Sequence, residues 1–209
     1  MADVDTGLFV SWIREFARLI GENAGYLTDL DAAVGDADHG VNMDRGMKAV
    51  VAKIDEGPDL GGVCKQVATA LIGSVGGAAG PLYGTLFLRM APVLGSVPST
   101  DATTFAAALR AGVDGVVARG HAEPGDKTMV DALAPAVETL DAALAAGATL
   151  PDALRRAADA AAAGRDATTP LVARKGRASY LGERSAGHLD PGAASSAMLI
   201  AAAATAAGG

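Results

Sequence analysis

The residues with the strongest chemical signature are three aspartates within the stretch "DAAVGDADHGVNM". Asp31, Asp36 and Asp38 stand at positions i, i+5 and i+7, and His39 follows directly. Hard cations such as Mg²⁺ take oxygen ligands, usually a few carboxylates completed by water and substrate phosphates. Residues 27–44 hold five aspartates and no Lys or Arg, so their mutual repulsion requires a counter-cation or wide spacing in water. The spacing alone leaves two interpretations open, a metal site and a solvated acidic turn.

A glycine-rich stretch, "GGAAGPLYG" at residues 76–84, is a candidate phosphate-binding loop. Backbone amides without bulky side chains, next to a helix N-terminus, favour anions. The stretch is not a Walker A loop, and no strand precedes it for a dinucleotide fold. Gly-Pro clusters are most often plain turns between helices, so this motif is weak evidence by itself.

A third stretch, "GDKTMVDAL" at residues 125–133, could offer Lys127 or Thr128 to a ligand. The alternative is an N-cap, in which a side-chain oxygen accepts from the first amides of the next helix. We expect that purely structural role for Asp126 more than for Thr128.

Basic residues gather in "ARKGRASYLGERSAGHLDPGA", in a chain whose net charge is −7. A basic run is most often a solvated face. Here it lies in a glycine-punctuated loop, and arginine is a common partner of phosphate oxygens. Asp190 fits an N-cap with Pro191 at the first helical position.

The composition predicts an all-α protein. Hydrophobic residues make up 50% of the chain and aromatic residues only 4%, and alanine, the strongest helix former, is abundant. Apolar residues repeat at helical spacing from the start, as in Phe9, Ile13, Phe16 and Ile20. The pattern predicts about eight helices. Alternate loops of an up-and-down bundle share one end, where the loops rich in Gly, Asp or Arg could converge: 28–42, 76–84, 120–128 and 174–192.

The remaining sequence features bound the class of protein. An acidic balance argues against a nucleic-acid surface. A single cysteine, Cys64, excludes an internal disulfide and fits a reducing compartment. The N-terminus lacks a positive signal region, and the apolar tail is shorter than a membrane span needs. We expect a cytoplasmic protein with one domain over residues 1–209 and no membrane partner.

Taken together, these motifs resemble the nucleotide-binding L subunit of dihydroxyacetone kinase. The matching text is "GDADHGVNMDRG", "GSVGGAAGPLYGT", "GDKTMVDAL" and "ARKGRASYLGERSAGHLDPGAASS", in that family's order over essentially the whole chain. The resemblance implies an eight-helix, antiparallel, barrel-like bundle that binds ADP or ATP at one end. It also implies that two Mg²⁺ ions are held by Asp31, Asp36 and Asp38.

The resemblance carries over further residues to the nucleotide. Arg177 would act with the three aspartates in catalysis as well as in binding. The other implied nucleotide contacts are His39, Gly40, Asn42, Met43, Ala79, Gly80, Gly120, Thr128, Met129, Asp190, Pro191 and Gly192. One departure is visible, because Ala79 stands where the family often has serine, so a hydroxyl contact to phosphate would be lost.

The resemblance leaves the phosphoryl donor open. In one setting the domain is fused to a domain that binds dihydroxyacetone, and the enzyme uses ATP. In the other it is a separate subunit that keeps ADP bound, works on a triose held by a K-type subunit, and is rephosphorylated by an M-type phosphocarrier subunit. The chain shows no candidate substrate domain, which favours the second setting. The alternatives are a subunit of an ATP-dependent kinase for another small ketose or sugar alcohol, and a nucleotide-dependent regulator of a transcription factor. Homodimerisation is a further open question.

Overall fold

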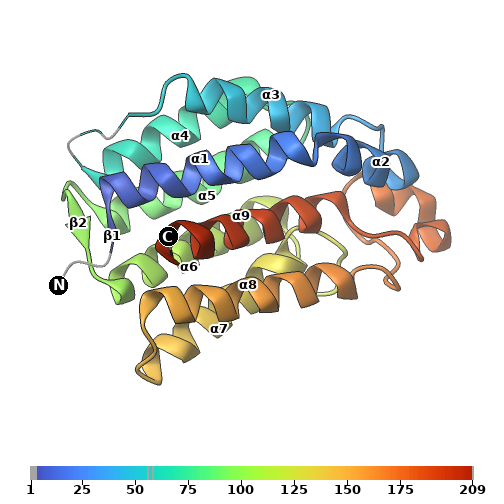
Figure 1. Cartoon of the computed structure of the whole chain (residues 1–209). Helices are drawn as coiled ribbons and strands as arrows, with labels where there is room; N and C mark the ends of the chain where they lie inside the picture. Colours follow the sequence, from blue (N-terminus) through green and yellow to red (C-terminus); the bar gives the residue numbers. More distant parts are fainter. Residues whose placement is uncertain (1–3, 56, 58, 209) are drawn as a thin grey trace.

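Eight long helices form a closed ring in the computed structural model, which describes residues 4–55, 57 and 59–208 (Figure 1). Each of these helices packs on the next in the chain, and the last packs on the first. The expected all-α, barrel-like bundle is therefore confirmed. The eight helices are α1 (Thr6–Glu22), α3 (His39–Val51), α4 (Leu60–Ser74), α5 (Ala79–Leu94), α6 (Ala102–Gly120), α7 (Val130–Ala145), α8 (Leu150–Ala167) and α9 (Pro191–Gly208).

Shorter elements complete the described part of the chain. A short helix, α2 (Ala24–Val34), links α1 to α3, and a 3-10 helix, η1 (Arg177–Ser185), lies between α8 and α9. Two-residue strands, β1 (Val4–Asp5) and β2 (Ser99–Thr100), pair antiparallel at one end of the barrel. The sequence did not predict this pair, because two residues are too few to show a strand period.

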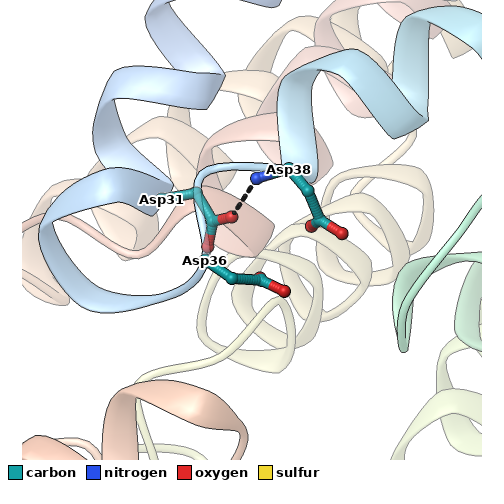
Figure 2. Close-up of side chains that lie close together, drawn as sticks. All are labelled: Asp31, Asp36 and Asp38. Atoms are coloured by element: carbon teal, nitrogen blue, oxygen red, sulfur yellow. Dashed lines mark hydrogen bonds between the residues drawn. The ribbon is translucent and has the colours of Figure 1, made fainter.

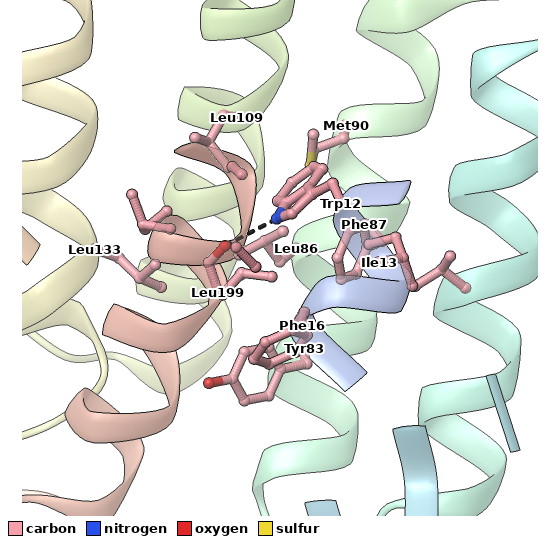
Figure 3. Close-up of a cluster of buried hydrophobic side chains, with 14 of the residues drawn as sticks. Trp12, Ile13, Phe16, Tyr83, Leu86, Phe87, Met90, Leu109, Leu133 and Leu199 are labelled. Carbon is pink, nitrogen blue, oxygen red and sulfur yellow. Dashed lines mark hydrogen bonds between the residues drawn. The ribbon is translucent and has the colours of Figure 1, made fainter. Parts of the chain in front are cut away.

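The barrel interior is filled by aliphatic side chains around a small aromatic group (Figure 3). Phe9 and Trp12 of α1 meet edge to face with ring centroids 5.1 Å apart, and Trp12 also packs on Phe105. The Trp12 Nε1–H donates to the Leu199 carbonyl at 2.8 Å, which ties α1 to α9. Because α1 and α9 are far apart in sequence, this contact closes the ring.

The two ends of the barrel differ in how the helices begin. At the end that carries β1 and β2, the starts of α1, α4, α6 and α8 are capped by side chains: Asp5, Asp59, Asp101 and Thr149. At the opposite end, α3, α5 and α7 receive no hydrogen bond from the side chain of their N-cap residue. Uncapped first turns leave backbone N–H groups available to a ligand.

The polar loop expected over residues 28–42 is shorter than predicted. Helix α2 continues to Val34 and α3 begins at His39, so only residues 35–38 are non-helical. The pattern of apolar residues also suggested one helix through residue 27, but the chain bends at Asn23, whose side chain donates to the Leu19 carbonyl. Polar residues on a short helix hid its periodicity, and the only local marks of the bend were Gly21 and Gly25 on either side of Asn23.

One described helix, α9, is long and apolar enough to meet a length-and-composition test for a membrane span. In this structure 56% of it is buried, and it packs against α1, α7 and α8. That packing is typical of the central helix of a globular core.

Candidate functional site

A cavity of about 400 Å³ opens at the end of the barrel where α3, α5, α7 and α9 begin. All four of the chemically distinctive loops contribute to its wall, so the expected convergence of those loops is found. The predicted site residues that line this cavity are Asp31, Asp36, Asp38, His39, Ala79, Gly120, Thr128, Met129, Arg177, Asp190, Pro191 and Gly192. Its size lies within the range of small-molecule sites.

The three aspartates form one cluster on the cavity wall (Figure 2). One oxygen of each carboxylate lies within 4.8 Å of the other two. Asp31 belongs to α2 and is 8% exposed, and its Oδ2 accepts from the backbone amides of Asp38 at 2.8 Å and His39 at 3.2 Å. These bonds hold the loop over the end of α2, so that all three carboxylates face one point.

The backbone of residues 35–38 is shaped for this approach. Gly35 packs so closely on Asp31 that a Cβ atom would collide with the carboxylate. Ala37 adopts a left-handed conformation with φ of 59°, which is uncommon for a residue other than glycine. The loop therefore holds an unfavourable backbone conformation that brings like charges together, which is characteristic of functional sites.

Arg177 forms an ion pair with one carboxylate of this cluster. Its Nη2 lies 2.9 Å from Asp36 Oδ2, although the two side chains are 66% and 37% exposed. Such an exposed pair contributes little to stability. The guanidinium is thus held loosely at the cavity mouth, where it could transfer its hydrogen bonds to a phosphate.

The opposite wall offers backbone donors. Gly77 precedes α5 with φ of 65°, and Ala78 supplies no side-chain cap to the first turn of that helix. Ala79 supplies no hydroxyl, as the sequence indicated, so any anion contact here is made by backbone amides. Helix N-termini carry partial positive charge, and the starts of α3, α5 and α7, none of which is capped by the side chain of its own N-cap residue, favour an anionic ligand.

A buried hydrogen-bond network lies behind the aspartates. His39 Nε2 is 2.9 Å from Ser195 Oγ, and the Tyr83 hydroxyl contacts Ser195 Oγ at 2.8 Å and Ser196 Oγ at 3.0 Å. Burial lowers the pKa of His39, an effect that Asp31 and Asp38 oppose. Burial raises the pKa of Tyr83 to about 12. The network fixes the imidazole against α9 and keeps the Tyr83 hydroxyl protonated.

Asp190 caps α9, as the sequence predicted. Its Oδ2 accepts from the Ala193 amide at 2.7 Å, and Pro191 is the first residue of the helix. Burial raises the pKa of Asp190 to about 7, against the opposing effects of the Ala193 amide and Lys127. The carboxyl group therefore titrates near neutral pH, which is unusual for aspartate.

The capping role expected for Asp126 is wrong. Its Oδ2 instead accepts from the Glu123 amide at 2.8 Å, within the same loop. Thr128 Oγ1 accepts from the Val130 amide at 3.1 Å at the start of α7. The Asp131 carboxylate holds the loop from the other side by accepting from the Thr128 amide at 2.7 Å.

Four of the residues implied by the resemblance lie behind the cavity wall rather than on it: Gly40, Asn42, Met43 and Gly80. Gly40 packs against α2, and Met43 is fully buried in the core. Asn42 accepts from Arg45 Nη2 at 2.7 Å. These four do not line the cavity itself, and they pack beside residues that do, so their contact with the nucleotide stays a prediction.

Other lining residues were not singled out from the sequence. They include Leu82, Tyr83 and Arg119, and Ser195 reaches the site through His39, whereas Lys175, which also lines the cavity, belongs to the basic stretch that the sequence marked. Leu82 and Tyr83 lie within the glycine-rich stretch near the start of α5, so the sequence could have indicated them as site residues. Arg119 and Ser195 lie within ordinary helical patterns, so the sequence offered no comparable signal.

The donor set fits a hard divalent cation. Three carboxylates converge, all ligands are oxygens, and the half-exposed side toward the cavity leaves room for water and phosphate oxygens. Neither sulfur nor imidazole is among the three ligands, which argues against a site built for softer metals.

These features define a class: an all-α barrel that combines a carboxylate cluster with an anion-favouring cavity at one end. Comparison with known proteins agrees. Residues 33–205 match the DAK2 domain family. The chain is 45% identical over 188 residues to the ADP-binding subunit DhaL of the PEP-dependent dihydroxyacetone kinase of Escherichia coli, covering 89% of this chain and 90% of that protein. It is 39% identical to the corresponding PTS-dependent subunit of Lactococcus lactis, covering 96% of each.

A solved structure shows the same fold. The dihydroxyacetone kinase of C. freundii superposes with a TM-score of 0.75 at 26% identity, covering 98% of this chain and 35% of that longer chain. The chain therefore belongs to the DAK2 domain family, and within it to the DhaL-type subunits. Its relatives are named as subunits of dihydroxyacetone kinase, a phosphotransferase.

Proposed function

We propose that this protein is the ADP-binding subunit of a phosphotransferase-system-dependent dihydroxyacetone kinase and acts in the cytoplasm as a single domain. The observation that carries the proposal is that the two relatives with that role match over at least nine-tenths of their own length. The cavity supports it, because three carboxylates meet there with helix starts that are not capped by their own N-cap side chains. These are the groups that a magnesium–nucleotide complex needs.

Residues of this chain would have separate roles in metal binding and phosphate binding. Asp31, Asp36 and Asp38 would hold two Mg²⁺ ions, whose positive charge would offset the negative charge of the phosphates during phosphoryl transfer. The amides at the start of α5 would bind the phosphates from the opposite wall. Arg177 would leave Asp36 and bind a phosphate oxygen at the mouth, where phosphoryl transfer depends on positioning and charge neutralisation.

The apolar part of the cavity would receive the base. Leu82, Val116 and Met129 give apolar side chains to the cavity wall, and Gly120, at the end of α6, lines it without a side chain. The triose would stay on a K-type partner subunit, and ADP would be rephosphorylated in place by an M-type phosphocarrier.

The test is to purify the protein without added nucleotide, denature it and identify what is released. We expect stoichiometric ADP. Reconstitution with the K-type and M-type subunits of a relative should give dihydroxyacetone phosphorylation that requires phosphoenolpyruvate and the carrier proteins. A protein that is free of nucleotide and exchanges ADP rapidly would contradict the proposal.

A second candidate is a subunit of an ATP-dependent kinase for another ketose. It is favoured by 36% identity to the D-erythrulose kinase of Mycolicibacterium smegmatis, although the chain spans only 32% of that protein. Phosphorylation of erythrulose with ATP and a K-type subunit, without phosphoenolpyruvate, would select this candidate.

A further inference from the structure

Lys127 is a buried cation that the proposed chemistry does not use. Its side chain is 1% exposed. The ammonium donates to four backbone carbonyls: Thr168 at 2.9 Å, Leu171 at 3.0 Å, Thr169 at 3.3 Å and His188 at 2.5 Å. An ammonium has three N–H donors, so these carbonyls already engage all of them and leave none for a ligand.

Two features make lysine an unfavourable choice here unless those bonds matter. The backbone of Lys127 is left-handed with φ of 62°, a conformation in which glycine or asparagine is less strained. Burial also removes water from the charge and lowers the pKa of Lys127, while Asp190 opposes that effect. The hydrogen bonds to the four carbonyls offset both costs.

The four carbonyls belong to one segment, residues 168–190, which leaves α8 and returns to the start of α9. Three of them directly follow α8, and His188 lies three residues before α9. The ammonium therefore joins the two ends of the segment, which we call its neck. The Gly187 amide donates to the Thr169 carbonyl at 2.8 Å beside it. The same segment carries Arg177, which reaches Asp36 across the cavity mouth.

We propose that Lys127 is a positioning residue: its ammonium locks the neck of segment 168–190 and so sets the Arg177 guanidinium at the phosphate end of the cavity. This inference rests on the proposed function, because it assumes that Arg177 binds a nucleotide phosphate. Lys127 lies on the cavity wall, but it acts through Arg177, because its ammonium donates to the four carbonyls and has no donor left for a phosphate.

The test compares Lys127→Met with the wild-type protein for binding of ADP and of adenosine, by calorimetry or NMR titration. Methionine has a similar length and no charge. We expect ADP affinity to fall at least tenfold and adenosine affinity to change less than twofold, because only ADP has phosphates for Arg177. Lys65→Met, at an exposed position on α4, is the matched control and should leave both affinities unchanged.

A double-mutant cycle then asks whether Lys127 works through Arg177. If it does, Lys127→Met should have little further effect on ADP binding in an Arg177→Ala background. Additive losses, or equal losses for ADP and adenosine, would overturn the inference. If Lys127→Met does not fold, Lys127→Arg enters the same cycle, since its planar guanidinium keeps the charge but does not match four converging carbonyls.

Limited trypsin digestion without ligand gives a readout that does not depend on nucleotide. We expect cleavage within segment 168–190 to be at least tenfold faster in Lys127→Met than in Lys65→Met. An unchanged cleavage rate would refute the lock. If the wild-type protein binds no ADP, the proposed function fails, and the digestion still decides whether Lys127 holds the segment.

Discussion

Removing one charge from the aspartate cluster should stabilise the protein while abolishing its response to magnesium and ADP. Asp38→Asn is the cleanest substitution, because the Asp38 side chain makes no cap hydrogen bond to α3 and asparagine is an equally good N-cap residue. The amide that donates to Asp31 belongs to the backbone and is retained. The change therefore removes charge with little change in shape.

The magnitude follows from the geometry. Charges 4.8 Å apart repel by about 1 kcal/mol at the dielectric constant of water, and Asp38 has two such neighbours. Arg177 offsets part of the charge of Asp36. We therefore expect the free energy of unfolding to rise by about 1–2 kcal/mol in the presence of a chelator, a Tm increase of roughly 2–8 °C for a chain of this size.

The wild-type protein should become the more stable of the two when Mg-ADP is bound. At a hundredfold excess over Kd, Mg-ADP stabilises a one-site protein by about 2.7 kcal/mol, and Asp38→Asn should gain far less. Thermal melts in chelator and in Mg-ADP measure both effects, with Asp29→Asn, an exposed aspartate of α2 outside the cluster, as the control. A variant that is less stable than wild type in chelator, or one that keeps the full Mg-ADP shift, would refute the reasoning.

Three further predictions concern other parts of the structure. Gly35→Ala places a Cβ atom against the Asp31 carboxylate, so Mg-ADP affinity measured by calorimetry should fall at least tenfold; unchanged affinity would show that the loop adapts. The raised pKa of Asp190, about 7 when folded against about 3.9 when unfolded, means that its neutral form stabilises the fold. Stability should decline by up to about 4 kcal/mol as pH rises from about 4 to 7, and Asp190→Asn, which retains a capping oxygen, should flatten that decline in urea titrations; an identical pH profile would contradict the assignment. Trp12→Phe removes the donor to the Leu199 carbonyl and leaves a cavity, so the free energy of unfolding should fall by about 2–4 kcal/mol, and a loss below about 1 kcal/mol in denaturant unfolding would mean that this contact does not close the ring.

The sequence predicted the architecture well wherever apolar spacing was regular. Phe9, Ile13, Phe16 and Ile20 are all buried on one face of α1, as their period required. The convergence of distant loops could also be predicted, because alternate loops of an up-and-down bundle share an end. What the sequence could not show was that Asp31 lies on a helix, since a charged residue facing a site interrupts the apolar pattern it belongs to.

The site was predicted less completely, for a related reason. Lys127 and Thr128 were both candidates for a ligand contact, yet the structure gives the lysine four carbonyl partners within its own chain. Partners such as these are backbone atoms of a remote segment, and backbone atoms carry no residue-type signal. For the same reason the hydrogen bond between His39 and Ser195 could not be predicted from spacing.

The unequal capping of the two barrel ends has a consequence for how the protein opens. Helix starts near β1 and β2 are capped by side chains within the chain, whereas at the cavity end α5 begins without a side-chain cap and only part of the first turns of α3 and α7 is capped, by Asp31 and Thr128. A ligand there would complete the secondary structure itself by accepting from the backbone amides that remain. The barrel should then lose its order from the cavity end first, and the nucleotide would set the lifetime of the folded state as well as the chemistry.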